Sequence, residues 1–202
     1  MSVTKKSLLL IFIVLLIDQV SKFYIKLNFR LGESVEVFGW FQIYFIENNG
    51  MAFGMEIIGK LFLTLFRIVA VAGLSYFIYY LIRKQAREGF VLAVSLLLAG
   101  AAGNIFDSVF YGVIFNDSYG QVATFLPDGG GYAPLFYGKV VDMLYFPLIV
   151  NDAGQTLFFS PVFNIADSAI SVAAAIILIF FRKELNEHLE SDKSKKKEQE
   201  DA

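Results

Sequence analysis

The 202-residue sequence contains no cysteine and a single histidine, His188. Without cysteine the chain has no disulfide, no thiolate nucleophile and no cysteine-ligated metal site. One histidine in a charged C-terminal segment supplies neither a histidine-based triad nor a multi-histidine metal site. Charged residues are also scarce, at 18% against about 25% in an average soluble domain. A formal net charge of −2 gives no electrostatic basis for binding nucleic acid.

Hydrophobic residues are abundant instead: they make up 56% of the chain, and the mean hydropathy is +0.59. The charged residues are concentrated at the C-terminus, where residues 183–202 contain 12 of the 36. The preceding residues are therefore too apolar for a water-soluble enzyme. We interpret residues 1–182 as one membrane domain and residues 183–202 as a charged, disordered cytoplasmic tail.

Four segments are long and apolar enough to cross a bilayer, whose core of about 30 Å needs roughly 20 helical residues. They are residues 7–27, 58–82, 89–111 and 161–181. Lysine and arginine precede the first segment, separate the second from the third and follow the fourth. That side is therefore cytoplasmic, with both termini inside. The expected fold is an all-α polytopic membrane protein with four transmembrane helices and a small extracytoplasmic β-cradle.

Two segments, about 28–57 and 112–160, are then extracytoplasmic loops. In the first loop, residues 35–48 alternate well enough to predict a short β-hairpin or small sheet. In the second, residues 112–138 are rich in glycine, tyrosine and phenylalanine and are predicted to be irregular.

Several ionisable side chains fall inside or at the ends of the predicted spans, where each costs a few kcal/mol on insertion scales. With a helical rise of about 1.5 Å per residue, Asp18, Asn104 and Asp167 all reach the outer third of the bilayer from the cytoplasmic side. Asp142 reaches the same level from the second outer loop. The polar residues are therefore predicted to converge on one layer just below the outer surface.

Structural roles account for some of these residues. Asp18 and Lys22 have the i, i+4 spacing, acid first, of a helical ion pair. Gly100 and Gly103, among alanines, allow close helix packing. Arg67 fits a snorkelling or counter-charge residue of little functional weight.

Once other protease mechanisms are excluded, two carboxylates remain as the candidate catalytic groups. The sequence has no H-E-x-x-H motif for zinc proteolysis, and the adjacent Ser21 and Lys22 point to different helix faces. Asp167, on a polar face with Asn164, and Asp142 on the adjoining loop would share a proton if held close. The charged member takes a proton from water, while the neutral member hydrogen-bonds the carbonyl and later protonates the leaving amine. The same polar face also suits mere interhelical packing.

Five short motifs, in order along the chain, resemble those of the lipoprotein signal peptidases (signal peptidase II). The family patterns are D-Q-x-x-K, N-x-G-x-A-F, G-x-x-G-N-x-x-D, V-V-D and F-N-x-A-D. The matching segments are residues 18–22, 48–53, 100–107, 140–142 and 163–167. Each motif is short, but five in this order on a four-span hydropathy profile are highly specific.

The resemblance implies an intramembrane aspartic endopeptidase of the bacterial inner membrane. It would remove the signal peptide from lipidated prolipoproteins on the N-terminal side of the diacylglyceryl-cysteine, with Asp142 and Asp167 as the catalytic dyad. The residues that would bind substrate or support the site are Asn48, Gly50, Gly100, Asn104, Asp107, Asn164 and Ala166, braced by Asp18 and Lys22. The resemblance implies no cofactor and no metal. The implied partners are diacylglyceryl-modified prolipoproteins and membrane lipid, and the chain would act as a monomer.

The sequence departs from the family pattern at Ser108, where an arginine usually follows the third-helix aspartate, so any charge needed there must come from elsewhere. The segment 112–138 is also longer than expected. An alternative function is a small membrane transporter or channel with buried aspartates, although the acids cluster near one face and no discontinuous-helix repeat appears. A purely structural membrane subunit is a third possibility.

Overall fold

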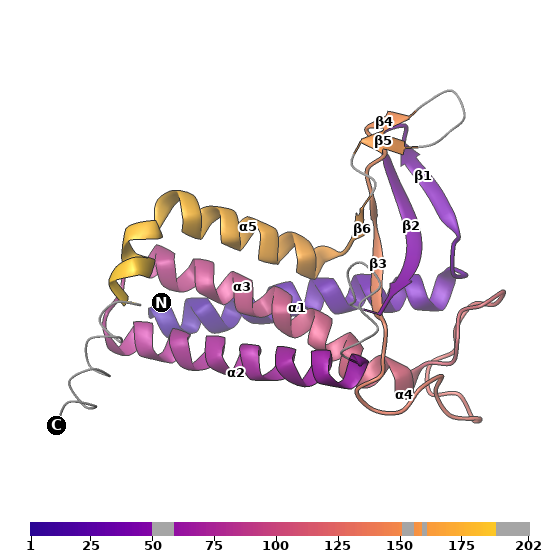
Figure 1. Ribbon diagram of the computed structural model, residues 1–202, viewed down its shortest axis with the longest axis horizontal. Helices are drawn as coiled ribbons and strands as arrows, with labels where there is room; N and C mark the ends of the chain where they lie inside the picture. Colours follow the sequence, from indigo (N-terminus) through magenta and orange to yellow (C-terminus); the bar gives the residue numbers. More distant parts are fainter. Residues whose placement is uncertain (50–58, 151–155, 159–160, 189–202) are drawn as a thin grey trace.

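The computed structural model describes residues 1–49, 59–150, 156–158 and 161–188. Figure 1 shows long helices lying side by side, with a small sheet at one end of the bundle. The helices are α1 (Val3–Asn28), α2 (Lys60–Arg83), α3 (Glu88–Phe106) and α5 (Ile165–Phe180). A π-helical turn, η2 (Asp107–Tyr111), and the short α4 (Gly112–Ile114) extend α3.

Three helical stretches are long and apolar enough to cross a membrane: Val3–Asn28, Lys60–Arg83 and Glu88–Ile114. These confirm three of the four predicted spans. α5 has 16 residues, which at about 1.5 Å per residue is short of a bilayer core of about 30 Å. It reaches spanning length only together with the helix Arg182–His188, from which it is bent by 88°.

The fourth span was predicted to begin at about residue 161, but its helix begins four residues later, at Ile165. Val162–Phe163 is a strand, β6, that pairs with β3. The predicted disorder of the tail is also wrong for its first residues, because the helix Arg182–His188 folds back onto the bundle. Arg87 lies 3.4 Å from Glu184, and the ring of His188 stacks on Phe90 with centroids 6.1 Å apart. Residues 189–202 lie outside the described part of the chain.

The outer sheet has the strand order β1-β2-β3-β6, with every neighbouring pair antiparallel. β1 (Ser34–Phe38) and β2 (Phe41–Asn48) form the predicted hairpin. β3 (Val140–Tyr145), from the second outer loop, adds to β2 with a bulge between Ile43 and Ile46. β4 (Ile149–Val150) and β5 (Thr156–Phe158) form a separate two-stranded ladder at the tip of the structure. The strands of this loop all follow residue 138, whereas residues 115–138, within the segment predicted to be irregular, form only isolated bridges, turns and bends.

α3 lies at the centre of the bundle and packs against α1, α2 and α5. Its glycines permit the close approach expected of them. A Cβ on Gly103 would lie 2.6 Å from Oδ2 of Asp18, and one on Gly100 would overlap the carbonyl oxygen of Ala166. Gly100 and Gly103 thus bring α1 and the start of α5 against the same end of α3.

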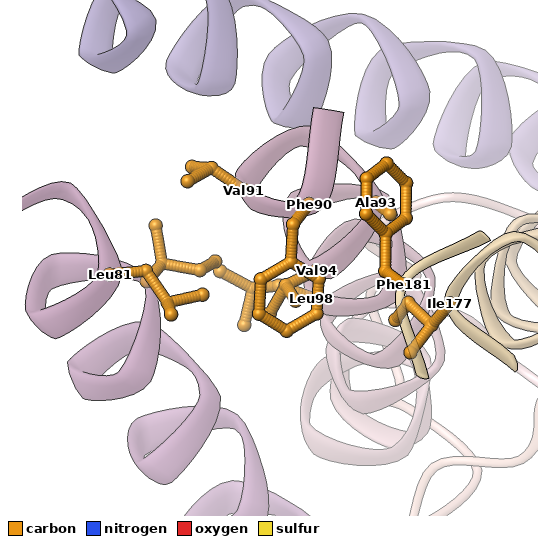
Figure 2. Close-up of a cluster of buried hydrophobic side chains, with 9 residues drawn as sticks. Leu81, Phe90, Val91, Ala93, Val94, Leu98, Ile177 and Phe181 are labelled. Carbon is orange, nitrogen blue, oxygen red and sulfur yellow. The ribbon is translucent and has the colours of Figure 1, made fainter. Parts of the chain in front are cut away.

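Two hydrophobic clusters hold the ends of the bundle together. Towards the end where the helix Arg182–His188 lies, Leu81 of α2 and Ile177 of α5 pack on either side of α3 (Figure 2). At the other end, residues of α1, η2, the sheet and the segment 112–138 form a second cluster. Its buried members are Ile25, Phe45, Tyr111, Phe115, Ala123, Val141 and Met143. The sheet is thereby packed onto the helices.

Candidate active site

The first turn of α5 positions Asp167 through a capping box. Asn164 is the N-cap residue, and its side-chain oxygen accepts a hydrogen bond of 2.8 Å from the backbone N–H of Asp167. In return, the Asp167 carboxylate accepts a 3.3 Å bond from the backbone N–H of Asn164. A negative charge in the first turn of a helix is stabilised by the helix dipole. The fold therefore provides this carboxylate with a fixed orientation and a favourable field.

Strand β3 carries Asp142, whose exposed fraction is 1%. The side-chain amide of Asn164 donates to its Oδ1 at 2.7 Å, and that of Asn48 donates to its Oδ2 at 3.3 Å. Burial and the negative charge of Asp167 raise the pKa of Asp142 to about 7, against the opposing effect of these hydrogen bonds and of Lys22. Asp142 and Asp167, hereafter the carboxyl pair, are therefore close enough for the charge of Asp167 to affect the ionisation of Asp142.

Asn104, near the end of α3, connects the carboxyl pair to a buried lysine. Its side-chain amide donates to Oδ1 of Asp167 at 2.7 Å. Its oxygen accepts one bond from Asn164 at 3.0 Å and one from Nζ of Lys22 at 2.9 Å. These two donors fix the amide so that its nitrogen faces Asp167.

The ammonium group of Lys22 lies between two buried carboxylates. It is 2.9 Å from Asp18, as the i, i+4 spacing predicted, and 2.8 Å from Asp107. Asp18 also accepts a 2.9 Å bond from the backbone N–H of Ala166, and Asp107 accepts a 3.3 Å bond from that of Val141. The ion cluster Asp18–Lys22–Asp107 therefore braces the two backbone segments that carry the carboxyl pair.

Gln19 is part of this arrangement, although sequence reasoning gave it no role. Its side-chain nitrogen lies within 3.0 Å of Asp18 and 2.9 Å of Asp107, and its oxygen accepts from the hydroxyl of Tyr111 at 3.1 Å. The sequence feature that could have indicated a role for Gln19 is its position in the first motif, between Asp18 and Lys22.

The sequence-predicted site residues thus fall into two groups. Asn48, Asn104 and Asn164 contact the carboxyl pair directly. The others that the structure describes act one contact further away: Asp18, Lys22, Gly100, Asp107 and Ala166. Gly50 lies outside the described residues.

Ser108 carries no charge and uses its hydroxyl on the helix itself, donating to the carbonyl oxygen of Asn104 at 2.9 Å. A cation comes from α2 instead, because the half-buried Arg67 interacts electrostatically with Asp167. This interaction fits the counter-charge reading of Arg67.

An apolar groove with a volume of about 760 Å³ adjoins the site. Its walls come from α1, the sheet and the first residue of α5, namely Leu16, Ile17, Val20, Ser21, Tyr24, Ile25, Phe29, Val35, Ile43, Met143, Leu144 and Ile165. Met143 follows Asp142 and Ile165 follows Asn164, so the groove borders the carboxyl pair without including it. Among the described residues, no cluster of three or more acidic or histidine side chains could hold a metal ion.

Comparison with known proteins identifies the family. A family model described as signal peptidase (SPase) II matches residues 10–183. A lipoprotein signal peptidase of Porphyromonas gingivalis is 46% identical over 195 residues, covering 92% of this chain and 86% of that protein. One from Amoebophilus asiaticus is 34% identical over 179 residues, covering 81% of this chain and 72% of that protein.

Solved structures agree with this result. A bacterial membrane enzyme determined by the in meso method at 2.3 Å is similar with a TM-score of 0.62 and 28% identity, covering 90% of each chain. A second, at 1.9 Å, has a TM-score of 0.61 and 28% identity, covering 87% of this chain and 91% of the other. The transporter alternative is not favoured by any of these matches. This chain belongs to the signal peptidase II family of membrane proteases.

Proposed function

We propose that this protein removes the signal peptide from lipidated prolipoproteins by cleaving on the N-terminal side of the diacylglyceryl-cysteine. Asp142 and Asp167 are the catalytic residues of the proposal. The observation that carries it is the bridge formed by Asn164, which binds Asp142 through its side chain and Asp167 through its backbone and cap. Water attack on an amide needs one basic and one acidic group together, and two coupled carboxyls supply both.

The environments of the two carboxyls favour different roles at rest. The pKa of Asp142, raised to about 7 by burial and by the charge of Asp167, favours the neutral acid. Asp167, in the first turn of α5, has the position that favours a negative charge. In the proposed mechanism, Asp167 takes a proton from water and the resulting hydroxide attacks the scissile carbonyl carbon. Asp142 hydrogen-bonds the carbonyl oxygen as it becomes negative, and the leaving amine receives a proton from the pair.

The surrounding residues hold this pair ready for catalysis. The amides of Asn48, Asn104 and Asn164 limit the rotation of both carboxyl groups, and the Lys22 cluster braces the segments behind them. The apolar groove beside the pair suits the hydrocarbon part of a lipidated substrate, since its walls are almost wholly apolar side chains. Gly50 belongs to the same substrate-binding motif as Asn48.

The proposal includes a location and an assembly state. We place the protein in the bacterial inner membrane, with both termini in the cytoplasm and the carboxyl pair near the outer face, on the basis of the lysine and arginine distribution. One chain carries both carboxyls and their amide partners, which supports a monomer as the active form.

The test is cleavage of a synthetic diacylglyceryl-modified prolipoprotein by the purified protein in detergent. We expect wild type to release the signal peptide, and Asp142→Asn and Asp167→Asn each to abolish release. The same precursor without the lipid serves as the control and is expected to stay intact. Substantial cleavage by either purified single variant would exclude the aspartic mechanism.

A further inference from the structure

A second buried ion cluster, separate from the one at Lys22, lies beneath the outer sheet. Glu47 of β2 accepts from two ammonium groups: Nζ of Lys26 is 2.6 Å from its Oε1, and Nζ of Lys139 is 3.0 Å from its Oε2. The Lys26 side chain is completely buried and that of Glu47 is 3% exposed. Burial raises the pKa of Glu47, but the two ammonium groups outweigh it and keep the pKa below its usual range. Glu47 is therefore ionised at neutral pH.

The segment 112–138 encloses this cluster. Lys26 donates to the hydroxyl of Ser118 at 2.8 Å, and its ammonium lies 5.2 Å from the ring centre of Tyr132. The hydroxyl oxygen of Tyr132 accepts a 2.6 Å bond from the backbone N–H of Lys139. The cluster thus joins the last turn of α1, strand β2, the long outer segment and the residue that precedes β3.

The cluster lies where β2 pairs with the part of β3 that carries Asp142. Glu47 is directly opposite Val141, and Ile46 is directly opposite Asp142. Successive side chains of a strand point to opposite faces, so Glu47 and Val141 lie on one face of the sheet while Asp142 lies on the other. A shift of β3 by one residue would turn the Asp142 carboxyl away from Asn164 and Asp167.

The ladder that sets this register next to Asp142 is short. The β2–β3 pair contains a bulge between Ile43 and Ile46, and only a short ladder remains between that bulge and the end of β2 at Asn48. The two ion pairs to Glu47 fix both strands at this short ladder, Lys139 from the β3 side and Lys26 from α1.

We propose that Glu47, held by Lys26 and Lys139, is a positioning residue that sets the register of β3 and thereby aims Asp142 at Asp167, with Tyr132 holding the backbone of Lys139 in place. The role of the segment 112–138 is to complete this cluster. The inference rests on the proposed function, because its effect is measured as cleavage of the lipidated precursor.

The test separates positioning from simple stability. Glu47→Gln leaves a buried ammonium without its counter-charge and is expected to lower both the amount of folded protein and kcat. Adding Lys26→Met to Glu47→Leu replaces the buried pair with apolar side chains, an exchange that is often neutral or stabilising. This double variant is expected to recover the folded amount while its kcat stays at least tenfold below wild type, with KM changed less than twofold. Recovery of kcat together with the folded amount would overturn the inference.

Tyr132→Phe is a milder variant that removes only the hydroxyl group that accepts a hydrogen bond from the backbone N–H of Lys139. We expect it to fold normally, to lower kcat several-fold, and to speed amide hydrogen exchange in residues 140–142. Unchanged kcat and unchanged exchange in this variant would also overturn the inference. The matched control is Glu88→Gln, which breaks the equally short 2.6 Å pair with Lys6 far from the site and should alter neither measurement. Wild-type cleavage in the same assay tests the proposed function independently of these variants.

Discussion

The side-chain nitrogen of Asn164 lies 2.7 Å from Oδ1 of Asp142, and this one hydrogen bond ties strand β3 to the start of α5. Asn164 is completely buried and caps the helix that carries Asp167. A single residue therefore contacts both carboxyls.

Replacing Asn164 should consequently affect stability and catalysis together. Asn164→Ala removes the helix cap, a loss of roughly 1 kcal/mol in typical proteins, and leaves Asp142 with one fewer donor. We expect a lower unfolding temperature and a loss of at least a hundredfold in kcat. Asn164→Ser keeps a side-chain oxygen for the cap but removes the amide donor to Asp142, and should recover part of the stability without recovering cleavage. Normal kcat in Asn164→Ala would contradict the bridging role.

Cleavage should depend on pH through the carboxyl pair, since Asp142 must hold a proton and Asp167 must not. With the pKa of Asp142 raised to about 7, the rate is expected to fall as pH rises through this value. The profile should be bell-shaped and should report the pair rather than either residue. A rate that stays constant from pH 6 to pH 9 would refute the assignment of Asp142 as the acid.

The raised pKa of Asp142 also predicts how the stability of the folded protein depends on pH. The folded protein retains the Asp142 proton up to about pH 7, whereas an unfolded chain loses it near pH 4. Between these values the folded state binds more protons, so its stability should decrease as pH rises. Asp142→Asn should remove this part of the dependence and unfold at a higher temperature than wild type above pH 7. Thermal unfolding in detergent at several pH values measures both effects.

Lys22 lies between two carboxylates, so replacing Lys22 should reduce the amount of folded protein more than replacing one of the aspartates. Lys22→Met leaves both Asp18 and Asp107 buried without a cation, and breaking a buried pair costs about 3–5 kcal/mol. Asp18→Asn leaves Lys22 paired with Asp107 and should be milder. The triple variant Lys22→Met, Asp18→Asn, Asp107→Asn should recover part of the folded protein lost in Lys22→Met. The amount of folded monomer after size-exclusion chromatography is the measurement, and equal losses in Lys22→Met and Asp18→Asn would contradict the arrangement.

Because the bent helix Arg182–His188 contacts the bundle, truncations before and after it should have different effects. Removing residues 189–202 deletes only a charged segment and should leave cleavage within a few-fold of wild type. Truncation after Lys183 also removes the ring contacts of His188 with Phe90 and Tyr80 and should lower the unfolding temperature. Equal stability of the two truncated proteins would show that this helix contributes nothing.

The hydropathy and motif patterns predicted the three spans that the structure confirms, the hairpin and all three asparagines that contact the carboxyl pair. These features are local: a run of apolar residues, an alternation, or a short motif. The sequence did not indicate that Lys22 pairs with Asp107 as well as Asp18, because the Lys22–Asp107 contact joins α1 to η2 and no spacing rule relates two different helices. β6 was missed because a two-residue strand has no periodicity and exists only through its pairing with β3. Glu47 was missed because its two lysine partners lie 21 and 92 residues away along the chain.

The shortness of α5 has a consequence for the surrounding lipid. A helix of 16 residues is about 24 Å long, and bilayers adapt to a short span by becoming thinner around it. Local thinning on the α5 side would bring the headgroup layer and its water closer to Asp167, in the first turn of that helix. Hydrolysis can then take place at the edge of the membrane without a water channel through the bundle, and the rate of cleavage should depend on the acyl-chain length of the host lipid.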